Sequence, residues 1–286
     1  MNIFIGTILV LGLVFGGYML SGGKMDILLH ALPYEGMMVG GAALGAFIIS
    51  NSVAMMLDTC RGLLRALKGP RFVKSDYADA MQLLYELTRL YRNRGILALE
   101  PHIENPQSSD IFSKYPKIAA FKPARDMVVD SFRMVSMQFD DAYQMEDFLN
   151  RRIEVYEAEV AGPANAMLAG SDGLPAIGIV AAVLGVIKTM ASVDEPPEIL
   201  GKMIAGALVG TFLGVFLAYC VVQPIAARLN QIEEHDSNLM KLIRDVICAT
   251  VKGNPPNIAV ELGRGNLPPH LQPAFDEIEQ AQRAIQ

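Results

Sequence analysis

The sequence predicts an all-α fold: a polytopic membrane protein with four transmembrane helices and a cytoplasmic helical domain. Hydrophobic residues make up 52% of the 286 residues, and the mean hydropathy of +0.31 is higher than a soluble domain usually has. Two apolar stretches, 173–190 and 203–223, are each long enough to cross a bilayer and are joined by a short acidic loop. Two more, 2–20 and 35–56, lie near the N-terminus.

The first apolar stretch, 2–20, is expected to stay in the protein as a membrane span. A secretory signal would carry a basic region before the apolar stretch and a small-residue cleavage site after it, and this stretch has neither. The second span, 35–56, is separated from the first by an expected loop at 21–34.

Basic residues predict the orientation. Those that follow the second span are Arg61, Arg65, Lys68, Arg71 and Lys74. The acidic loop 192–198 has no basic residue and the first loop has only Lys24, and loops rich in Lys and Arg stay in the cytoplasm. The expected segments are therefore membrane at 1–56 and 166–224 and cytoplasm at 57–165 and 225–286, with both termini in the cytoplasm.

Small residues recur every four positions in the fourth span, at Gly206, Gly210, Gly214 and Ala218. Such a seam lets another helix approach closely. Because the seam runs nearly the whole membrane thickness, we expect it to pack against a helix of another chain as well as within this one. Thr211 is the main hydroxyl in this span, and its side chain either lines an ion path or bonds to its own helix.

Ionisable residues are expected only near the ends of the spans. Glu35 and Asp172 fall at span ends, and Lys188 lies far enough along the third span to reach outward. A proton or ion carrier needs an ionisable group at membrane depth. If the chain helps to pass ions, a partner must then supply the carboxylate.

Two prolines mark the inner ends of the hairpin: Pro175 begins the third span and Pro224 closes the fourth. Each is either a simple helix cap or a hinge between the membrane and the cytoplasm.

The cytoplasmic part is expected to be a compact helical domain. Residues 77–91 have apolar side chains at helical spacing, and 124–160 read as a second helical region. The stretch 93–106 is expected to be irregular because it contains Pro101 and Pro106. Prolines and polar residues after Pro268 predict a flexible tail.

No enzyme signature is present, and we expect no metal, no cofactor and no nucleic acid. The sequence has no Gly-rich phosphate loop, metal-binding histidine pair or Gly-x-Ser-x-Gly motif, and its three cysteines lack metal-ligand spacing. Its basic residues cluster beside the membrane, where anionic lipid explains them. Exposed charges are either a solvated face or contacts for a protein partner; they include Arg92, Arg94, Glu100 and Glu104.

Several motifs in the expected order resemble one family, the flagellar motor stator subunit MotA of the MotA/TolQ/ExbB superfamily. The resemblance covers nearly the whole chain, from 14–18 (VFGGY) to 254–261 (NPPNIAVE). Its most specific stretches are 103–106 (IENP), 174–183 (LPAIGIVAAV) and 209–214 (VGTFLG).

The resemblance implies a stator subunit of the bacterial cytoplasmic membrane that turns proton flow into torque. Five copies would surround two copies of MotB, whose aspartate carries the ion and whose single transmembrane helix would occupy the seam of the fourth span. Arg92 and Glu100 would contact the rotor protein FliG, although Pro101 and His102 replace the usual charged pair after the glutamate. Pro175 and Pro224 would couple ion flow to movement.

Two positions bear on the coupling ion. Sodium-driven relatives carry threonines where this chain has Ala182 and Gly210. Sodium needs fixed oxygen ligands, so the resemblance implies protons. The alternatives are an ExbB/TolQ-like proton-driven energiser of outer-membrane processes, a self-contained transporter, for which a buried ionisable group and an inverted repeat are missing, and a structural scaffold.

Overall fold

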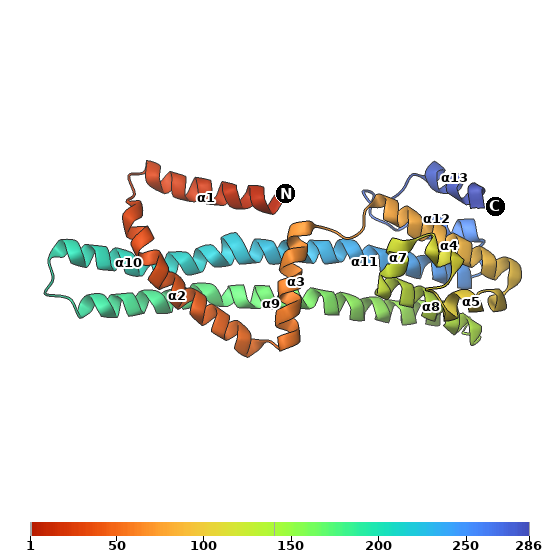
Figure 1. The fold of residues 1–286 in the computed structure, drawn as a ribbon, viewed down its shortest axis with the longest axis horizontal. Coiled ribbons are helices and arrows are strands. Elements are labelled where there is room, and N and C mark those ends of the chain that lie inside the picture. The colour runs from red at the N-terminus through yellow and green to blue at the C-terminus, as the bar shows by residue number, and fades with distance from the viewer. Residues whose placement is uncertain (1, 140, 286) are drawn as a thin grey trace. The chain divides into compact units, whose positions relative to one another are not determined.

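Helices make up all the regular structure in residues 2–139 and 141–285, which the computed structural model describes. This confirms the all-α prediction. The elements are α1 (Asn2–Leu20), α2 (Met25–Ser50), α3 (Val53–Lys68), α4 (Lys74–Arg94), the 3₁₀ turn η1 (Ile96–Ala98), α5 (Glu100–Glu104), α6 (Asp110–Ser113), α7 (Pro116–Ala120), α8 (Lys122–Ser136), α9 (Ala142–Met190), α10 (Pro197–Phe216), the π-helical turn η2 (Leu217–Val222), α11 (Gln223–Val251), α12 (Pro256–Gly265) and α13 (Phe275–Ile285) (Figure 1).

The chain divides into two compact units. The membrane unit comprises Met1–Gly69 and Ala161–Gln231, and the polar unit comprises Pro70–Val160 and Ile232–Gln286. Helices α9 and α11 each contribute one part to each unit. The membrane unit includes α3, which the sequence assigned to the cytoplasmic segment.

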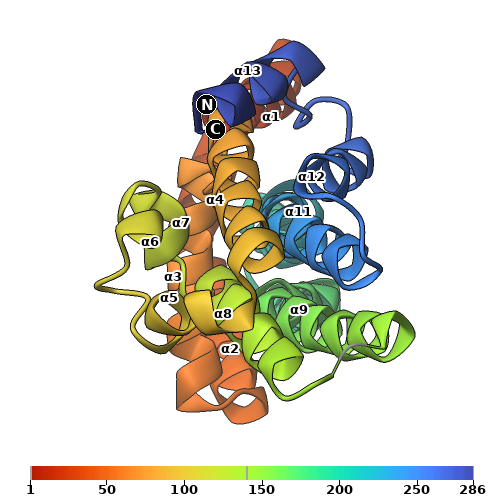
Figure 2. The same ribbon diagram turned by 90° about the vertical axis from the view of Figure 1, so that its right-hand side faces the viewer.

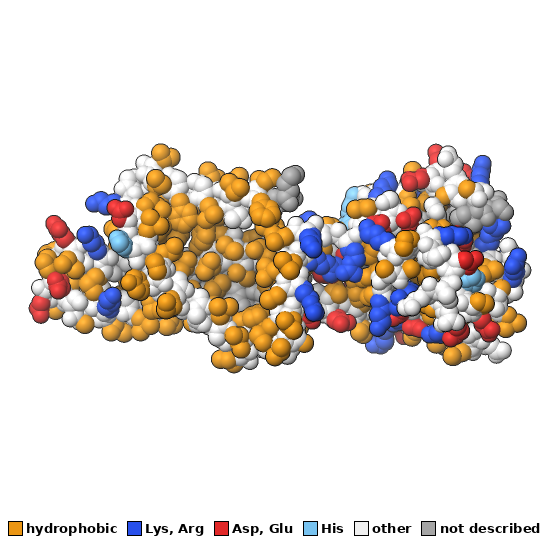
Figure 3. All heavy atoms as spheres, in the orientation of Figure 1, with side chains coloured by type: hydrophobic (Ala, Val, Ile, Leu, Met, Phe, Trp, Pro, Cys, Tyr) orange, Lys and Arg blue, Asp and Glu red, His pale blue; other side chains and the backbone are white. Residues whose placement is uncertain are grey.

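Four helical stretches among the described residues are long and apolar enough to cross a membrane: Ile3–Leu20, Met25–Ser50, Ala142–Met190 and Pro197–Val251. Hydrophobic side chains cover most of the visible face of α1 and α2 (Figure 3). Large apolar side chains such as Ile8, Met37 and Ile49 are exposed there, as expected for helix surfaces that contact lipid. The four predicted transmembrane helices are thus confirmed as candidate membrane spans.

The second span begins ten residues earlier than expected. Helix α2 starts at Met25 and ends at Ser50, so Glu35 lies inside it and no loop reaches residue 34. The expected span 35–56 is therefore wrong at both ends. Residues 27–32 are mostly apolar and lengthen the helix at its N-terminal end. The helix ends before Asn51, whose backbone has a β conformation.

Helix α3 is a separate amphipathic helix. The Ser52 hydroxyl caps it by accepting a hydrogen bond from the Met55 amide at 3.2 Å. Gly62 meets α11 and α9 closely, since a Cβ there would lie 2.8 Å from Leu229 and 3.4 Å from Pro163. Helix α3 accordingly crosses both helices steeply (Figure 1). It leaves leucines exposed together with Arg61 and Lys68, a pattern typical of a helix lying at a membrane surface.

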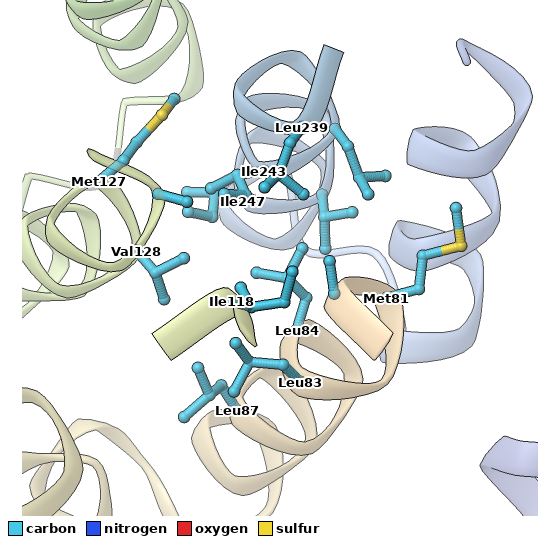
Figure 4. Packing of buried hydrophobic residues seen from close by; sticks show 14 of the residues in the cluster. Met81, Leu83, Leu84, Leu87, Ile118, Met127, Val128, Leu239, Ile243 and Ile247 are labelled. Atoms are coloured by element: carbon cyan, nitrogen blue, oxygen red, sulfur yellow. The ribbon is translucent and has the colours of Figure 1, made fainter. Parts of the chain in front are cut away.

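The polar unit has its own hydrophobic core, which confirms the helix predicted at 77–91. Leucines of α4 meet Ile118 of α7 and isoleucines of α11. Figure 4 shows this cluster, which includes Leu83, Leu84, Leu87, Ile118, Val128, Ile243 and Ile247. The helical region predicted at 124–160 is two helices, because α8 ends at Ser136 and α9 begins at Ala142.

A buried carboxylate fixes the start of the polar unit. Asp236 is fully buried and accepts hydrogen bonds from the backbone amides of Arg71 at 3.0 Å and Phe72 at 3.4 Å. The Tyr77 hydroxyl donates to the His235 carbonyl at 2.8 Å. Burial, together with the charges of nearby Asp236 and Asp76, raises the pKa of Tyr77. The tyrosine therefore stays a neutral donor at physiological pH.

The C-terminal segment is ordered rather than flexible, so the predicted flexible tail is wrong. Leu271 and Ile278 are buried, and both α12 and α13 pack on α4 (Figure 2). Apolar residues spaced between the prolines give this segment enough surface to bury.

Cys248 of α11 gives a chemical test of the polar core. Burial raises the pKa of its thiol to about 11, so at pH 8 about one molecule in a thousand carries the reactive thiolate. We expect an alkylating reagent at pH 8 to spare Cys248 in the folded protein and to modify it after denaturation in detergent, as read by peptide mass spectrometry. Exposed Cys60 is the comparison; equal labelling of the two thiols in the folded protein would contradict this packing.

Candidate functional site

The closest helix contact in the membrane unit joins α9 to α10 through facing glycines. A Cβ on Gly178 would lie 2.8 Å from the Gly210 carbonyl oxygen and 3.2 Å from the Cα atoms of Gly214 and Thr211. A Cβ on Gly214 would lie 2.5 Å from the Leu174 carbonyl oxygen. Backbone therefore meets backbone along this contact, which only glycine permits.

Helix α2 packs along the same seam in parallel with α10. Ala31 faces Gly206, Glu35 faces Gly210, and Gly36 faces Leu213, so residue numbers rise together along the two helices. Gly210 also faces α9, where a Cβ would lie 3.1 Å from the Ala181 Cβ and 3.3 Å from the Ala182 amide nitrogen. Three helices thus meet at Gly210.

The predicted seam is mostly buried. Gly210, Gly214 and Ala218 are buried, and Gly206 is half-buried. At the three glycines, the space beside α10 is taken by α2 and α9 of the same chain. Packing of the seam within this chain is thus confirmed, and its contact with a partner's helix stays a prediction. The regular four-residue spacing indicated a close contact correctly but could not say which helix makes it.

Glu35 is the residue that the sequence reasoning misplaced. It lies ten residues into α2, about 15 Å along a helix that rises 1.5 Å per residue. Its side chain is only 6% exposed, and Oε2 has no hydrogen-bond partner. Glu35 therefore lies within a candidate membrane span, whereas the sequence placed it at the end of one. The apolar residues between Met25 and Glu35 were the signal that could have extended the span.

The two predicted hinge prolines both lie next to irregular or interrupted helix. Pro175 lies inside α9, not at its start, and cannot donate a hydrogen bond to the Ser171 carbonyl. Pro224 is the second residue of α11, which directly follows η2. A π-helical turn widens the backbone, and here it stands where Pro224 removes one helical hydrogen bond. Pro175 adjoins Leu174, whose carbonyl faces Gly214.

Arg92 and Glu100 are both exposed in the polar unit, on either side of η1. Arg92 is near the end of α4, and its Nη1 atom donates to the Gly253 carbonyl oxygen at 2.7 Å. Glu100 is the first residue of α5 and is solvent-exposed. Gly95, with a φ of 76°, makes the turn between them. Both charges are available to a partner at the surface.

The residues after Glu100 are used within the fold. Pro101 occupies the first turn of α5, where its missing amide costs nothing. His102 Nδ1 lies 2.8 Å from the Ser109 hydroxyl and 3.4 Å from an Asp110 carboxylate oxygen. This pair therefore anchors α5 to α6 instead of presenting charge outward.

Glu104, at the end of α5, is committed to an ion pair. Arg133 Nε and Nη2 donate to its two carboxylate oxygens at 3.0 and 3.1 Å. These hydrogen bonds hold the pKa of the Glu104 carboxyl below its usual range. Glu104 is thus a weaker candidate for a partner contact than Glu100. Within residues 2–139 and 141–285, no group of three or more His, Cys, Asp or Glu side chains could hold a metal ion.

The chain combines apolar helices, two of which meet through facing glycines, with a charged unit that has its own core. This combination defines a multi-pass helical membrane protein. Two family models match the chain: "Motility protein A N-terminal" over residues 4–95 and "MotA/TolQ/ExbB proton channel family" over residues 120–241. Motility protein A of Salmonella typhimurium is 38% identical over 285 residues, covering 100% of this chain and 96% of the relative. Chemotaxis protein LafT of Vibrio parahaemolyticus is 32% identical, covering 98% and 97%.

This chain belongs to the motility protein A family, as the resemblance in the sequence indicated. Membership confirms a channel-family protein and not an enzyme. The fold is similar to that of C. jejuni MotAB, with a TM-score of 0.72, 18% identity and coverage of 94% of this chain and 96% of that one. For the flagellar MotAB stator complex of Bacillus subtilis, the TM-score is 0.65 and the identity is 21%, with coverage of 97% of this chain and 98% of that one.

Proposed function

We propose that this chain is a stator subunit of the bacterial flagellar motor, forming with a MotB partner a proton channel that drives torque on the rotor protein FliG. The observation that carries the proposal is the likeness to motility protein A over the full chain, both membrane hairpins and polar unit included. An ExbB/TolQ-like energiser is less well supported, because the N-terminal family model, which reaches residue 95, is specific to motility protein A.

The proposed assembly has five copies of this chain around two of MotB in the cytoplasmic membrane, with the polar unit and both termini in the cytoplasm. The orientation is supported by the basic residues that α3 carries directly after the second span. Anionic lipid would contact the same helix. The MotB partnership is supported by the MotAB complexes that share this fold.

Proton coupling is supported by the surroundings of Gly210. A Cβ at this position would meet the Glu35 carboxyl group and would lie 3.1 Å from the Ala181 Cβ and 3.3 Å from the Ala182 amide nitrogen, so a side chain bearing a hydroxyl would require its neighbours to shift. Ala182, half-buried on the facing helix, also lacks a hydroxyl. Together with half-buried Thr211, these residues are proposed to lie beside the ion path.

In the proposed mechanism, a proton neutralises the partner's aspartate and changes which surface of this chain the partner's helix prefers. Neutralising a charge in an apolar setting shifts its preferred surroundings by several kcal/mol. Each proton supplies about 2.3 kcal/mol per 100 mV of membrane potential. Pro175 and Pro224 would then pass the movement to the polar unit, whose Arg92 and Glu100 push the rotor electrostatically. No covalent step is required.

The test is rotation of tethered cells that lack their own stator and receive this chain with its MotB partner, in buffers with and without sodium. We expect rotation that is independent of sodium and is stopped by a protonophore. Absence of rotation despite assembly with MotB would contradict the proposal, unless a chimera carrying the host's own polar unit restores it, which would indicate an incompatible rotor.

The rotor contact makes a separate prediction about α5. We expect Glu100→Lys to reduce tethered-cell torque by at least half, because it reverses an exposed charge without breaking a bond inside the fold. Glu104→Gln is the matched control on the same short helix. Glu104 is occupied by Arg133, so torque should remain near wild type. Equal losses in the two variants would point to damage to α5 and against a rotor contact at Glu100.

A further inference from the structure

Glu35 is a titratable group that has no role so far in the proposed function, because the partner supplies the proton-carrying carboxylate and Glu35 is not part of the rotor contact. It stands where α2, α9 and α10 meet, about 15 Å along α2 and opposite Gly210, which is about 20 Å along α10. A bilayer core is about 30 Å thick. Counted from the helix ends nearest the 191–196 loop, both residues lie at depths smaller than this thickness and inside candidate spans.

On the side facing Gly210, Glu35 adjoins a methyl group and backbone. The atoms facing Gly210 beside the Glu35 carboxyl are the Ala181 methyl group and the Ala182 backbone. Oε2 is without a hydrogen-bond partner, although the side chain is 94% buried, the complement of its 6% exposure. A carboxylate kept for structural reasons is normally hydrogen-bonded when buried, so packing alone does not explain this one.

The charged groups near Glu35 all lie toward the outer side of the proposed orientation. Lys188 of α9 is close enough to act on Glu35 electrostatically. The other charged or titratable groups of these three helices on that side are Asp26, His30 and Tyr34 of α2 and Glu198 and Lys202 of α10, and all but Tyr34 are at least one helical turn farther out. Of the carboxyl groups on this side, Glu35 is the innermost and the one that is buried.

We propose that Glu35 is a second proton-binding carboxylate of the channel, contributed by this chain. Its carboxylate oxygen accepts a proton from a hydronium ion on the outer side, forming an O–H bond and releasing water, and that bond breaks when the proton passes to the partner's carboxylate. Buried ionisable groups in membrane helices commonly serve such relays. The proposal rests on the proposed proton channel and adds to it a site in this subunit.

The experiment measures proton uptake by liposomes that hold the complex of this chain with its MotB partner. We expect Glu35→Gln to assemble with the partner and to lower proton flux at least tenfold, because the amide fits the pocket but cannot exchange a proton. Glu35→Asp keeps the exchangeable group and should retain more than half of the flux. Glu198→Gln, at the outer start of α10, is the matched control and should leave the flux unchanged.

A second measurement uses the wild-type complex and does not depend on how the variants fold. A hydrophobic carbodiimide, which modifies protonated carboxyls in apolar surroundings, is expected to label Glu35, as read by peptide mass spectrometry. Wild-type flux in Glu35→Gln would overturn the proposal. If Glu35→Gln fails to assemble, labelling of Glu35 supports the relay and absence of labelling overturns it. A wild-type complex that assembles but conducts no protons would instead refute the proposed channel.

Discussion

Gly214→Ala is expected to stop rotation and to lower the melting temperature of the purified complex. The new Cβ would lie 2.5 Å from the Leu174 carbonyl oxygen and 2.9 Å from the Gly178 Cα. Both are backbone atoms, so α9 and α10 must move apart. Such overpacking costs about 1–3 kcal/mol, more than the roughly 1 kcal/mol that alanine gains over glycine in a helix. Fluorescence-detected gel filtration after heating measures the loss.

Gly206→Ala is the matched control, two turns earlier in the same seam. Its new Cβ would lie 3.7 Å from the Ala31 Cβ, an ordinary contact. We expect stability and rotation near wild type. If both alanine variants behaved alike, the α9–α10 contact would have to be looser than the facing glycines indicate.

Pro175→Ala is expected to leave the complex assembled and at least as stable, yet unable to turn the motor. Alanine restores the amide that can donate to the Ser171 carbonyl, and it removes the ring that disturbs the preceding turn. Helix propensity alone favours this change by up to about 3 kcal/mol. The stiffened helix would then resist bending beside the Leu174–Gly214 contact. Tethered-cell rotation and co-purification with the partner separate the two effects.

Pro163→Ala, twelve residues earlier in α9, tests whether any straightening of this helix has the same result. Pro163 lies against Gly62 of α3 rather than against α10. Rotation should persist in this variant. Normal torque in Pro175→Ala would exclude the hinge, whereas loss of torque in both variants would indicate a general need for an irregular α9.

The sequence was sufficient for the parts of the fold that rest on long, uniform patterns. The hairpin of α9 and α10 followed from two apolar runs, and α4 followed from its regular leucines. The N-terminal end of α2 could not be predicted in this way, because Glu35 interrupts the apolar run and a hydropathy pattern ends a span at a carboxylate. In the structure, Glu35 lies within α2 and packs against Gly210. The exposed positions of Arg92 and Glu100 were foreseen, whereas the bond from Arg92 to Gly253 joins residues 161 positions apart.

The contact of α2, α9 and α10 also has a mechanical meaning. Because α9 and α10 meet backbone to backbone, they cannot slide past one another by repacking side chains and should move as one rigid pair, whereas α2 contacts α10 through side chains. The helical hydrogen-bond ladder is interrupted by Pro33 in α2, by Pro163 and Pro175 in α9, and at η2 with Pro224. If bending is concentrated at Pro175 and at η2, as proposed, the paired α9 and α10 would store little elastic energy and would transmit force through two short segments.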